Sequence, residues 1–354
     1  MKIYGVIMAG GGGTRFWPLS RKQTPKQLLN LSGKEIMVNE AIDRLARVCS
    51  YEDIFVVTNK TQTEKMSCVT EGRIRKNHIL AEPAARNTAA CLCYAAMEIE
   101  KKYGGGIMVV TPSDAFIKNN EEFAEVLKTA IETAEKTDSL VTVGVTPTFP
   151  ATGYGYIKFG NSDTKAKPVI KFVEKPDLKT AEEYLKSGDY VWNSGMFIWK
   201  TSVILRKFKE LLPDIYERIE NISKSFGSEN EKNTIEEIYP SIRSISVDYG
   251  IMEKSDNIKV VQGEFGWNDV GSWDMMNVLH SEDKDGNIKI GKTVCIETTN
   301  STVFSSGKLV ATVGIDNLVI VETPDAVLVC PKEKAQDVKK IVDALKEKNE
   351  EELL

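Results

Sequence analysis

Histidine is almost absent from this sequence of 354 residues, in which His78 and His280 are the only two. Histidine is the side chain that most often transfers protons in enzymes. We therefore expect no histidine base, and we expect any chemistry to depend on carboxylates, lysines and arginines.

The cysteines show none of the spacings that hold a metal. There is no C-x-x-C motif and no Cys/His cluster of the kind that binds zinc. Two cysteines fall close together, but they lie in a predicted helix, where residues two apart point in different directions. We expect six free thiols, namely Cys49, Cys68, Cys91, Cys93, Cys295 and Cys330.

Long apolar runs and runs of a single charge are also missing. No stretch approaches the ~20 apolar residues that span a bilayer, and Met1-Lys2 leads into a predicted strand without a signal-peptide pattern. The net charge is −5, and no run is dominated by Lys and Arg. We therefore expect a cytoplasmic protein with neither a nucleic acid nor a membrane as its partner.

The sequence does contain a conspicuous glycine loop. An apolar run over residues 3–8 ends in four consecutive glycines, residues 10–13, and Arg15 and Lys26 follow. A plain turn needs one or two residues with positive φ rather than four, so a turn without a ligand is the weaker interpretation. Free backbone amides beside two cations suit a polyphosphate.

Two common glycine motifs do not fit this loop. The dinucleotide fingerprint G-x-G-x-x-G requires a third glycine where this chain has Arg15 or Phe16. The P-loop requires Gly-Lys-Ser/Thr where this chain has Arg15-Phe16-Trp17. A phosphate loop of another type is favoured.

The pattern over the first 145 residues is one of strands alternating with helices. Strands are predicted at 54–58, 78–81, 107–110 and 140–145, and helices at 36–48, 62–71, 89–103 and 121–136, the third capped by Asn87 or Thr88. Such alternation predicts a parallel, doubly wound sheet whose ligands gather at the carboxyl ends of the strands. The glycine loop, Glu82 and Asp114 all follow strand ends, so we expect them on one rim.

Later segments change the predicted architecture twice. Strands at 154–159 and 169–173 have no long helix between them, so we expect the sheet to become mixed there. Beyond Asp283, short β-prone runs recur every 8–10 residues before a final amphipathic helix. The sequence predicts an α/β domain over residues 1–283 and a small repeated-strand domain, β-helix-like, with a C-terminal helix over residues 284–354.

The glycine loop closely resembles the signature of the sugar nucleotidyltransferases, and within them that of the mannose-1-phosphate guanylyltransferases. The resemblance covers roughly residues 3–280, continues in part into the tail, and rests on seven segments in order. They are the run Met8-Ala9-Gly10-Gly11-Gly12-Gly13-Thr14-Arg15-Phe16-Trp17-Pro18-Leu19-Ser20-Arg21 with Pro25-Lys26-Gln27, Glu82-Pro83-x-x-Arg86-Asn87-Thr88, Pro112-Ser113-Asp114, Phe172-Val173-Glu174-Lys175-Pro176, Trp192-Asn193-Ser194-Gly195-Met196-Phe197, Asp248-Tyr249, and Trp267-Asn268-Asp269-Val270-Gly271-Ser272-Trp273.

Three features depart from the family pattern. Ala115 stands where a histidine usually follows the aspartate, and Gly250 stands where alanine is common. The chain also ends where longer relatives continue into a cupin-like isomerase domain, so that second activity is not expected.

The resemblance implies a Rossmann-like fold and a reaction of GTP with mannose 1-phosphate that gives GDP-mannose and pyrophosphate. It implies Arg15, Lys26 and Lys175 as catalytic residues, and Mg²⁺ held by Asp114 and Asp269. The implied nucleotide site comprises Ala9, Gly10, Gly11, Gly12, Gly13, Thr14, Arg15, Lys26, Glu82, Pro83, Asn87, Thr88, Ser113 and Asp114. The implied sugar-phosphate site comprises Gly155, Glu174, Lys175, Asn193 and Gly195.

Other interpretations of these residues stay open. Asp114 could cap a turn, Lys175 could be a solvated lysine at a strand edge, and Asp269 could bond its own backbone. The chain could transfer a different nucleotide to a different sugar phosphate, or it could be a sugar-nucleotide sensor without activity. The nucleobase and sugar preference and the oligomeric state, for which a homodimer is one candidate, are not set by the sequence.

Overall fold

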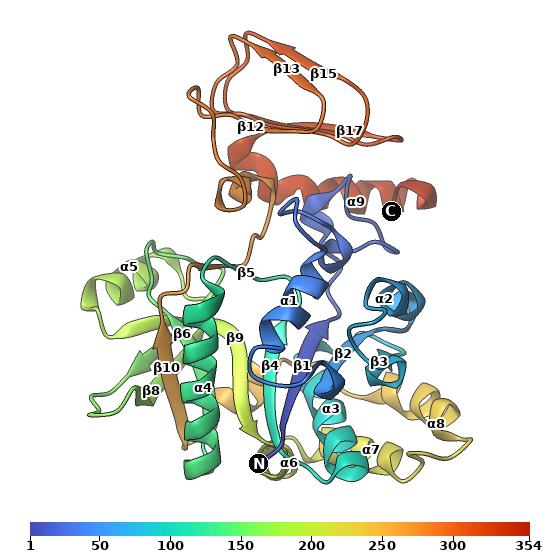
Figure 1. The fold of residues 1–354 in the computed structure, drawn as a ribbon, viewed down its shortest axis with the longest axis vertical. Helices are drawn as coiled ribbons and strands as arrows, with labels where there is room; N and C mark the ends of the chain where they lie inside the picture. Colours follow the sequence, from blue (N-terminus) through green and yellow to red (C-terminus); the bar gives the residue numbers. More distant parts are fainter. The chain divides into compact units, whose positions relative to one another are not determined.

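The computed structural model describes residues 1–354, and contacts within the chain divide it into two units (Figure 1). The first unit comprises residues 1–10, 41–113 and 117–267. The second comprises residues 11–40, 114–116 and 268–354. The glycine loop therefore leaves the first unit at residue 10 and shares the second unit with the C-terminal part of the chain.

The first unit is built on a nine-stranded sheet with the order β3-β2-β1-β4-β9-β6-β10-β8-β7. Strands β3, β2, β1 and β4 pair in parallel in that order, and β6 pairs in parallel with β10. The other neighbours in the sheet are antiparallel. The strands are β1 Ile3–Ala9, β2 Ile54–Asn59, β3 Ile79–Glu82, β4 Ile107–Pro112, β6 Leu140–Val145, β7 Gly155–Phe159, β8 Ala166–Glu174, β9 Tyr190–Lys200 and β10 Ile258–Gly263. The predicted parallel start and the later change to a mixed sheet are both confirmed.

Helices cover this sheet, and α4 lies along β6, β9 and β10 (Figure 1). Helices α3, α6 and α7 pack against one another. The bounds are α1 Met37–Leu45, α2 Thr63–Val69, α3 Asn87–Tyr103, α4 Asn120–Thr137, α5 Leu178–Ser187, α6 Thr201–Leu211, α7 Pro213–Ser223 and α8 Glu231–Ile238. Residues 89–99 of α3 are all buried. Small alanine side chains among them let the helix pack closely against its neighbours.

The start of α3 differs from the prediction. Arg86 is the N-cap residue, and no side chain caps the helix. Asn87 takes a positive φ of 63° and accepts from the amide of Thr88, whose hydroxyl accepts in turn from the amide of Val247 at 2.9 Å. The prediction that Asn87 or Thr88 caps α3 was wrong, because both side chains hold neighbouring amides instead.

The C-terminal strands of the second unit form the predicted repeated-strand layers, and helix α9 runs along them (Figure 1). Parallel strands β12, β14 and β16 make one layer, which the antiparallel β17 completes, and β13 pairs in parallel with β15 in a second. The bounds are β12 Ile288–Ile290, β13 Thr293–Ile296, β14 Thr302–Ser305, β15 Val310–Val313, β16 Leu318–Glu322, β17 Val327–Pro331 and α9 Lys339–Glu347. Two further short strands are β5 Phe116–Ile117 and β11 Trp267–Asn268.

The core of the second unit joins the glycine-loop segment to the C-terminal segment. The ring of Phe16 lies 5.3 Å from that of Trp273, measured between centroids, and both side chains are fully buried. The indole of Trp273 donates to the carbonyl of Trp17 at 3.1 Å, and the indole of Trp17 donates to the carbonyl of Leu353 at 2.9 Å. These contacts span most of the length of the chain.

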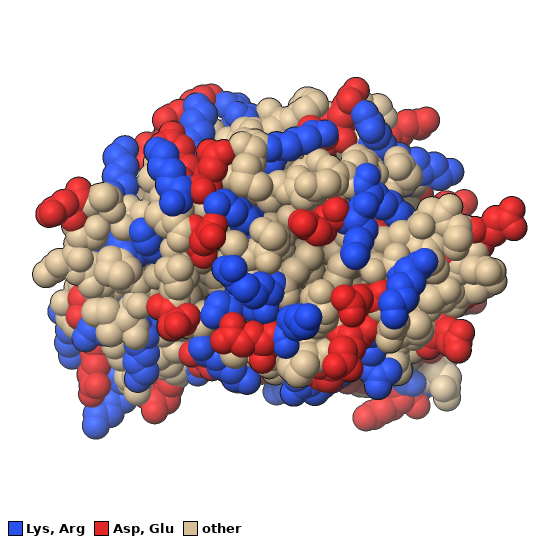
Figure 2. Space-filling model, turned by 90° about the horizontal axis from the view of Figure 1, so that it is seen from below, with Lys and Arg blue, Asp and Glu red and all other residues tan.

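The surface carries both charges. Lys and Arg side chains alternate with Asp and Glu over the face in Figure 2, in keeping with 46 basic and 51 acidic residues. None of the helices combines the length and the apolar character that crossing a membrane requires.

Candidate functional site

The glycine loop closes tightly against the segment that carries Lys26. Gly13 takes a positive φ of 58° and precedes a short 3₁₀ turn, Thr14–Phe16. A Cβ atom at Gly13 would collide with the side chain and the backbone of Lys26. Only glycine can satisfy both demands, the left-handed conformation and the close approach.

Lys26 is 4% exposed and bonds to two other segments of the second unit. Its ammonium group donates to the carbonyl and the carboxylate Oδ2 of Asp114, at 2.9 and 3.0 Å, and to the carbonyl of Asp269 at 2.6 Å. An ammonium group has three protons, so all of its donors are used. Lys26 therefore ties together the two aspartates that the sequence proposes for metal.

These three residues line a cavity of about 340 Å³ in the second unit. The lining consists of Gly13, Thr14, Arg15, Lys26, Asp114, Asp269, Gly271 and Lys339. Arg15 is exposed and makes no ion pair. Thus the structure brings the predicted cations of the glycine loop and both predicted metal ligands into one cavity.

The donor set of this cavity suits a hard divalent cation only with help from a ligand. It offers two carboxylates, and the chain contains no group of three His, Cys, Asp or Glu side chains that could hold a metal ion. A Cβ on Gly271 would lie 3.2 Å from Oδ2 of Asp269, so glycine leaves room beside that carboxylate. Mg²⁺ typically binds through one or two carboxylates with waters and substrate phosphates, so the residues fit this mode.

The segment predicted to meet the nucleobase lies in the first unit. Glu82 ends β3 and is 6% exposed, and the hydroxyl of Tyr239 donates to its Oε1. Burial raises the pKa of Glu82 from 4.5 to about 7. A Cβ on Gly10 would lie 3.5 Å from its Oε2, so this carboxylate lies beside the start of the glycine loop. Pro83 follows directly, and Asn87 and Thr88 are the first two residues of α3.

The carboxyl ends of β1 and β4 lie side by side at one edge of the sheet. Met8 pairs with Pro112, and the amide of Ser113 donates to the carbonyl of Met8 at 3.0 Å. The carbonyl of Ala9 accepts from the hydroxyl of Thr58 at 3.0 Å. Within the first unit, the strand ends that precede the predicted phosphate residues are therefore aligned as the pattern predicted.

The predicted sugar-phosphate residues form a second cluster in the first unit. Gly155 pairs with Glu174, and a Cβ there would collide with Oε2 of that carboxylate. Lys175 has a positive φ of 48°, and its ammonium lies 3.1 Å from Oε1 of Glu174. The side-chain oxygen of Asn193 accepts from the amide of Gly195 at 3.2 Å. Oε2 of Glu174 is buried without a partner, which leaves an acceptor for a ligand hydroxyl.

Asp248 belongs to this cluster although no role was predicted for it. The amide nitrogen of Asn193 donates to its Oδ1 at 2.9 Å. Burial, followed by the nearby charge of Glu174, raises the pKa of Asp248 to about 6. The Asp248-Tyr249 pair stood out in the sequence only as part of a resemblance, and nothing local linked it to Asn193.

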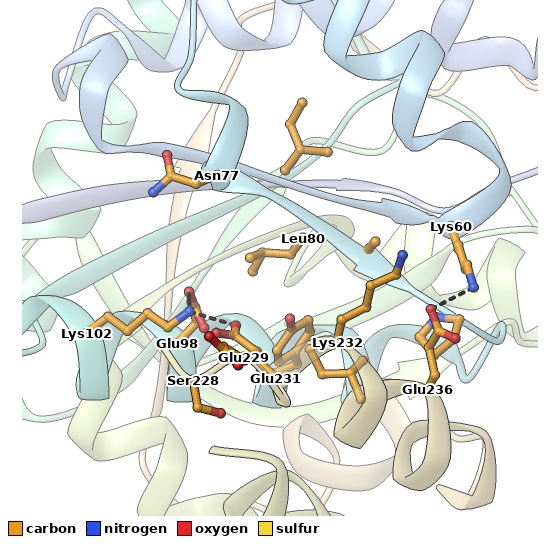
Figure 3. Close-up of a pocket in the computed structure, with 15 residues that line it drawn as sticks. Lys60, Asn77, Leu80, Glu98, Lys102, Ser228, Glu229, Glu231, Lys232 and Glu236 are labelled. Carbon is orange, nitrogen blue, oxygen red and sulfur yellow. Dashed lines mark hydrogen bonds and ion pairs between the residues drawn. The ribbon is translucent and has the colours of Figure 1, made fainter. Parts of the chain in front are cut away.

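A larger cavity of about 450 Å³ lies elsewhere in the first unit, beside β3, α3 and α8 (Figure 3). Its charges largely satisfy one another: the ammonium of Lys102 lies 2.8 Å from Glu98 and 2.7 Å from Glu231, and Lys60 pairs with Glu236 at 2.7 Å. Among the predicted site residues only Pro83 lines it. Size alone therefore does not identify the functional site.

Known families and proteins match this chain along almost its whole length. A family model described as nucleotidyl transferase matches residues 4–285, and one described as MannoseP isomerase/GMP-like beta-helix domain matches residues 291–345. The xanthan biosynthesis protein XanB of Xanthomonas campestris pv. campestris (strain B100) is 37% identical over 342 residues, which cover 96% of this chain and 73% of that protein.

Two further relatives cover almost the whole chain. A mannose-1-phosphate guanylyltransferase of Klebsiella pneumoniae is 38% identical over 361 residues, which cover 98% of this chain and 74% of that protein. A crystal structure from Thermus thermophilus, named as a mannose-1-phosphate geranyltransferase, is 34% identical with a TM-score of 0.89, and the match covers 98% of this chain and 100% of that one.

Proposed function

We propose, from the premise that the chain belongs to the nucleotidyl transferase family, that it makes GDP-mannose and pyrophosphate from GTP and mannose 1-phosphate. The observation that carries the proposal is the cavity of the second unit, in which glycine amides, Arg15, Lys26 and two aspartates lie together. Cations and free amides suit a polyphosphate, and the two carboxylates suit the divalent ion that accompanies it.

The reaction is an in-line displacement at the α-phosphorus of GTP. An oxygen of the sugar phosphate forms a bond to this phosphorus, and the bond to the bridging oxygen of the β-phosphate breaks, so that pyrophosphate leaves. The sugar phosphate has a second pKa of about 6 and is already an anion at neutral pH. No general base is needed, and a site without histidine is sufficient.

Catalysis then reduces to positioning two anions and neutralising the charge on the leaving group. We assign Arg15 and the amides of residues 10–14 to the triphosphate. Lys26 positions Asp114 and Asp269 through its three hydrogen bonds, and it can turn a proton to phosphate when its ion pair with Asp114 opens. Asp114 thus has two alternative partners, the Lys26 ammonium and a metal ion.

Nucleotidyl transferases generally use divalent metal ions, and we propose that here the ion is Mg²⁺, held by Asp114 and Asp269. When bound, it would supply positive charge at the α-phosphate. The two carboxylates come from segments that Lys26 holds together, so the backbones that carry them are joined before any ligand arrives.

The substrates are distinguished by the residues of the first unit. We assign the segment of Glu82, Pro83, Asn87 and Thr88 to the guanine base and Ala9 and Ser113 to the nucleotide. We assign Lys175 to the phosphate of the sugar, and Gly155, Glu174, Asn193 and Gly195 to its hydroxyl groups. The free Oε2 of Glu174 supports this assignment, because sugar hydroxyls are hydrogen-bond donors.

The most informative test is a panel of nucleoside triphosphates against sugar 1-phosphates that measures pyrophosphate release. We expect the highest kcat/KM for GTP with mannose 1-phosphate. Release with another pair would reassign the base or the sugar. Binding of GDP-mannose without any release would favour a sensor. A domain boundary after residue 283, a homodimer and a cytoplasmic location remain predictions of the sequence.

A further inference from the structure

We propose that Lys339, the first residue of α9, binds the phosphates that leave as pyrophosphate, so that the C-terminal segment supplies a catalytic side chain. The inference rests on the proposed function. None of the signature segments reaches this far along the chain, and residue 339 lies beyond the nucleotidyl transferase match, which ends at residue 285.

The first observation is where Lys339 lies. It lines the same 340 Å³ cavity as Arg15, Lys26, Asp114 and Asp269. All of these residues belong to the second unit, so the cavity lies within one packed body. Lys339 therefore shares the cavity of the glycine loop, although more than three hundred residues separate the two in sequence.

The second observation is the state of the cations in this cavity. The three protons of Lys26 are already bonded to protein oxygens. Lys339 is exposed and forms no ion pair, and the same is true of Arg15. A triphosphate remains strongly anionic after one divalent ion binds. The two unpaired cations are the groups that can neutralise it without breaking existing bonds.

The third observation is that the protein holds the start of α9 in place. A 3₁₀ turn, Lys332–Val338, leads directly into α9 and buries Ala335 and Val338. The side-chain amide of Gln336 donates to the hydroxyl of Ser272 at 2.6 Å, one residue beyond Gly271 of the cavity. The backbone of Lys339 is thus fixed beside the loop that carries Asp269, while its flexible stem lets the ammonium follow a phosphate.

The residues around Lys339 favour the leaving pyrophosphate, rather than the sugar phosphate, as the group that Lys339 binds. The cavity holds the glycine loop and Arg15, which we assign to the triphosphate, whereas Lys175 of the sugar cluster belongs to the first unit. Pyrophosphate gains charge as its bond to the α-phosphorus breaks. A cation that meets the growing charge lowers the barrier as well as improving binding.

The test compares Lys339→Ala with Lys340→Ala. Lys340 is the adjacent lysine, but its ammonium pairs with Asp337 at 2.8 Å and it does not line the cavity. We expect Lys339→Ala to raise the KM for GTP, and the KM for pyrophosphate in the reverse reaction, by about 10-fold, with the KM for mannose 1-phosphate changed by less than about 3-fold. Lys340→Ala should match the wild type in all three, and Lys339→Arg should recover most of the loss.

Calorimetric titration of the proteins with pyrophosphate and Mg²⁺ gives a readout that does not depend on turnover. Weaker binding in Lys339→Ala but not in Lys340→Ala is expected. Equal binding by the two variants overturns the inference. A lower melting temperature in Lys339→Ala with unchanged pyrophosphate binding also overturns it, because Lys339 would then be structural.

The two proposals can fail separately. If the wild type releases pyrophosphate from GTP and Lys339→Ala behaves identically, only the role of Lys339 is wrong. If the wild type releases none with any substrate pair, the proposed function is wrong, and the titration still decides whether Lys339 binds pyrophosphate.

Discussion

The ammonium of Lys26 lies 2.6 Å from the main-chain carbonyl of Asp269 and donates to it. The same ammonium pairs with the carboxylate of Asp114. All three protons of Lys26 thus bond to protein oxygens, and these bonds join two acidic segments that are distant in sequence. The geometry gives Lys26 a positioning role in addition to its predicted contact with phosphate.

The first prediction concerns the two aspartates. Asp269→Asn or Asp114→Asn should lower turnover at least ~10²-fold, because each change removes a charged ligand from the proposed metal site. Steady-state rates of pyrophosphate release should be compared with those of Asp343→Asn, which removes an exposed carboxylate paired with Lys346. Wild-type rates in excess chelator would rule out the metal.

The second prediction concerns the choice of base. GTP should be used with a higher kcat/KM than ATP, since polar groups of the segment that begins at Glu82 would stay unpaired beside adenine. Steady-state measurement of kcat/KM for GTP and for ATP, each with mannose 1-phosphate, tests this prediction. Equal efficiencies would contradict the assignment of this segment to guanine.

The third prediction separates the two anions. Lys175→Ala should raise the KM for mannose 1-phosphate by an order of magnitude or more, equivalent to roughly 1.4 kcal/mol, and leave that for GTP within a few fold. Lys171→Ala is the matched control, because Lys171 is an exposed lysine on β8, the strand that ends immediately before Lys175. The reverse pattern would assign Lys175 to the triphosphate.

The fourth prediction follows from the raised pKa of Glu82, which burial brings from 4.5 to about 7. Between these two values the folded state holds more protons than the unfolded state, so the free energy of unfolding falls as pH rises through this window. Glu82→Gln should remove this contribution, and its stability relative to the wild type should be higher at pH 8 than at pH 5.

Urea unfolding at both pH values measures the effect. Glu71→Gln, at an exposed position, should keep the pH dependence of the wild type. If Glu82→Gln and Glu71→Gln lose stability in parallel with the wild type between pH 5 and pH 8, Glu82 does not hold its proton in the folded state.

Many strands and helices of the first unit were predictable because they follow local rules, whereas β9 was not predicted as a strand. Strand 140–145 was predicted with its observed bounds, since a run rich in β-branched residues between polar residues is typical of a strand. In the second unit, the predicted β-prone runs began at Lys292, so strand β12 was missed, because Ile288–Ile290 is only three residues long and contains a lysine. The predicted capping of α3 was wrong because the hydroxyl of Thr88 accepts from the amide of Val247, which is 159 residues away.

The residue types of the candidate site can be read from the sequence, whereas their connections cannot. The glycine run beside cations indicated a phosphate ligand, the resemblance implied the metal roles of Asp114 and Asp269, and both stay predictions. The bonds that use up the protons of Lys26, and the hydrogen bond of Asn193 to Asp248, depend on how distant segments meet. Lys339 was not singled out, because it stands among several lysines in a charged segment and nothing local distinguishes it.

The bond from the indole of Trp17 to the carbonyl of Leu353 has a consequence for biosynthesis. The glycine-loop segment leaves the ribosome early, yet its core partners, Trp273 and Leu353, are made far later. Strands β1 to β4 can pair while translation continues, but the cavity beside the glycine loop is complete only after Asp269, Gly271 and Lys339 have been made. A nascent chain should therefore remain inactive until synthesis has passed α9.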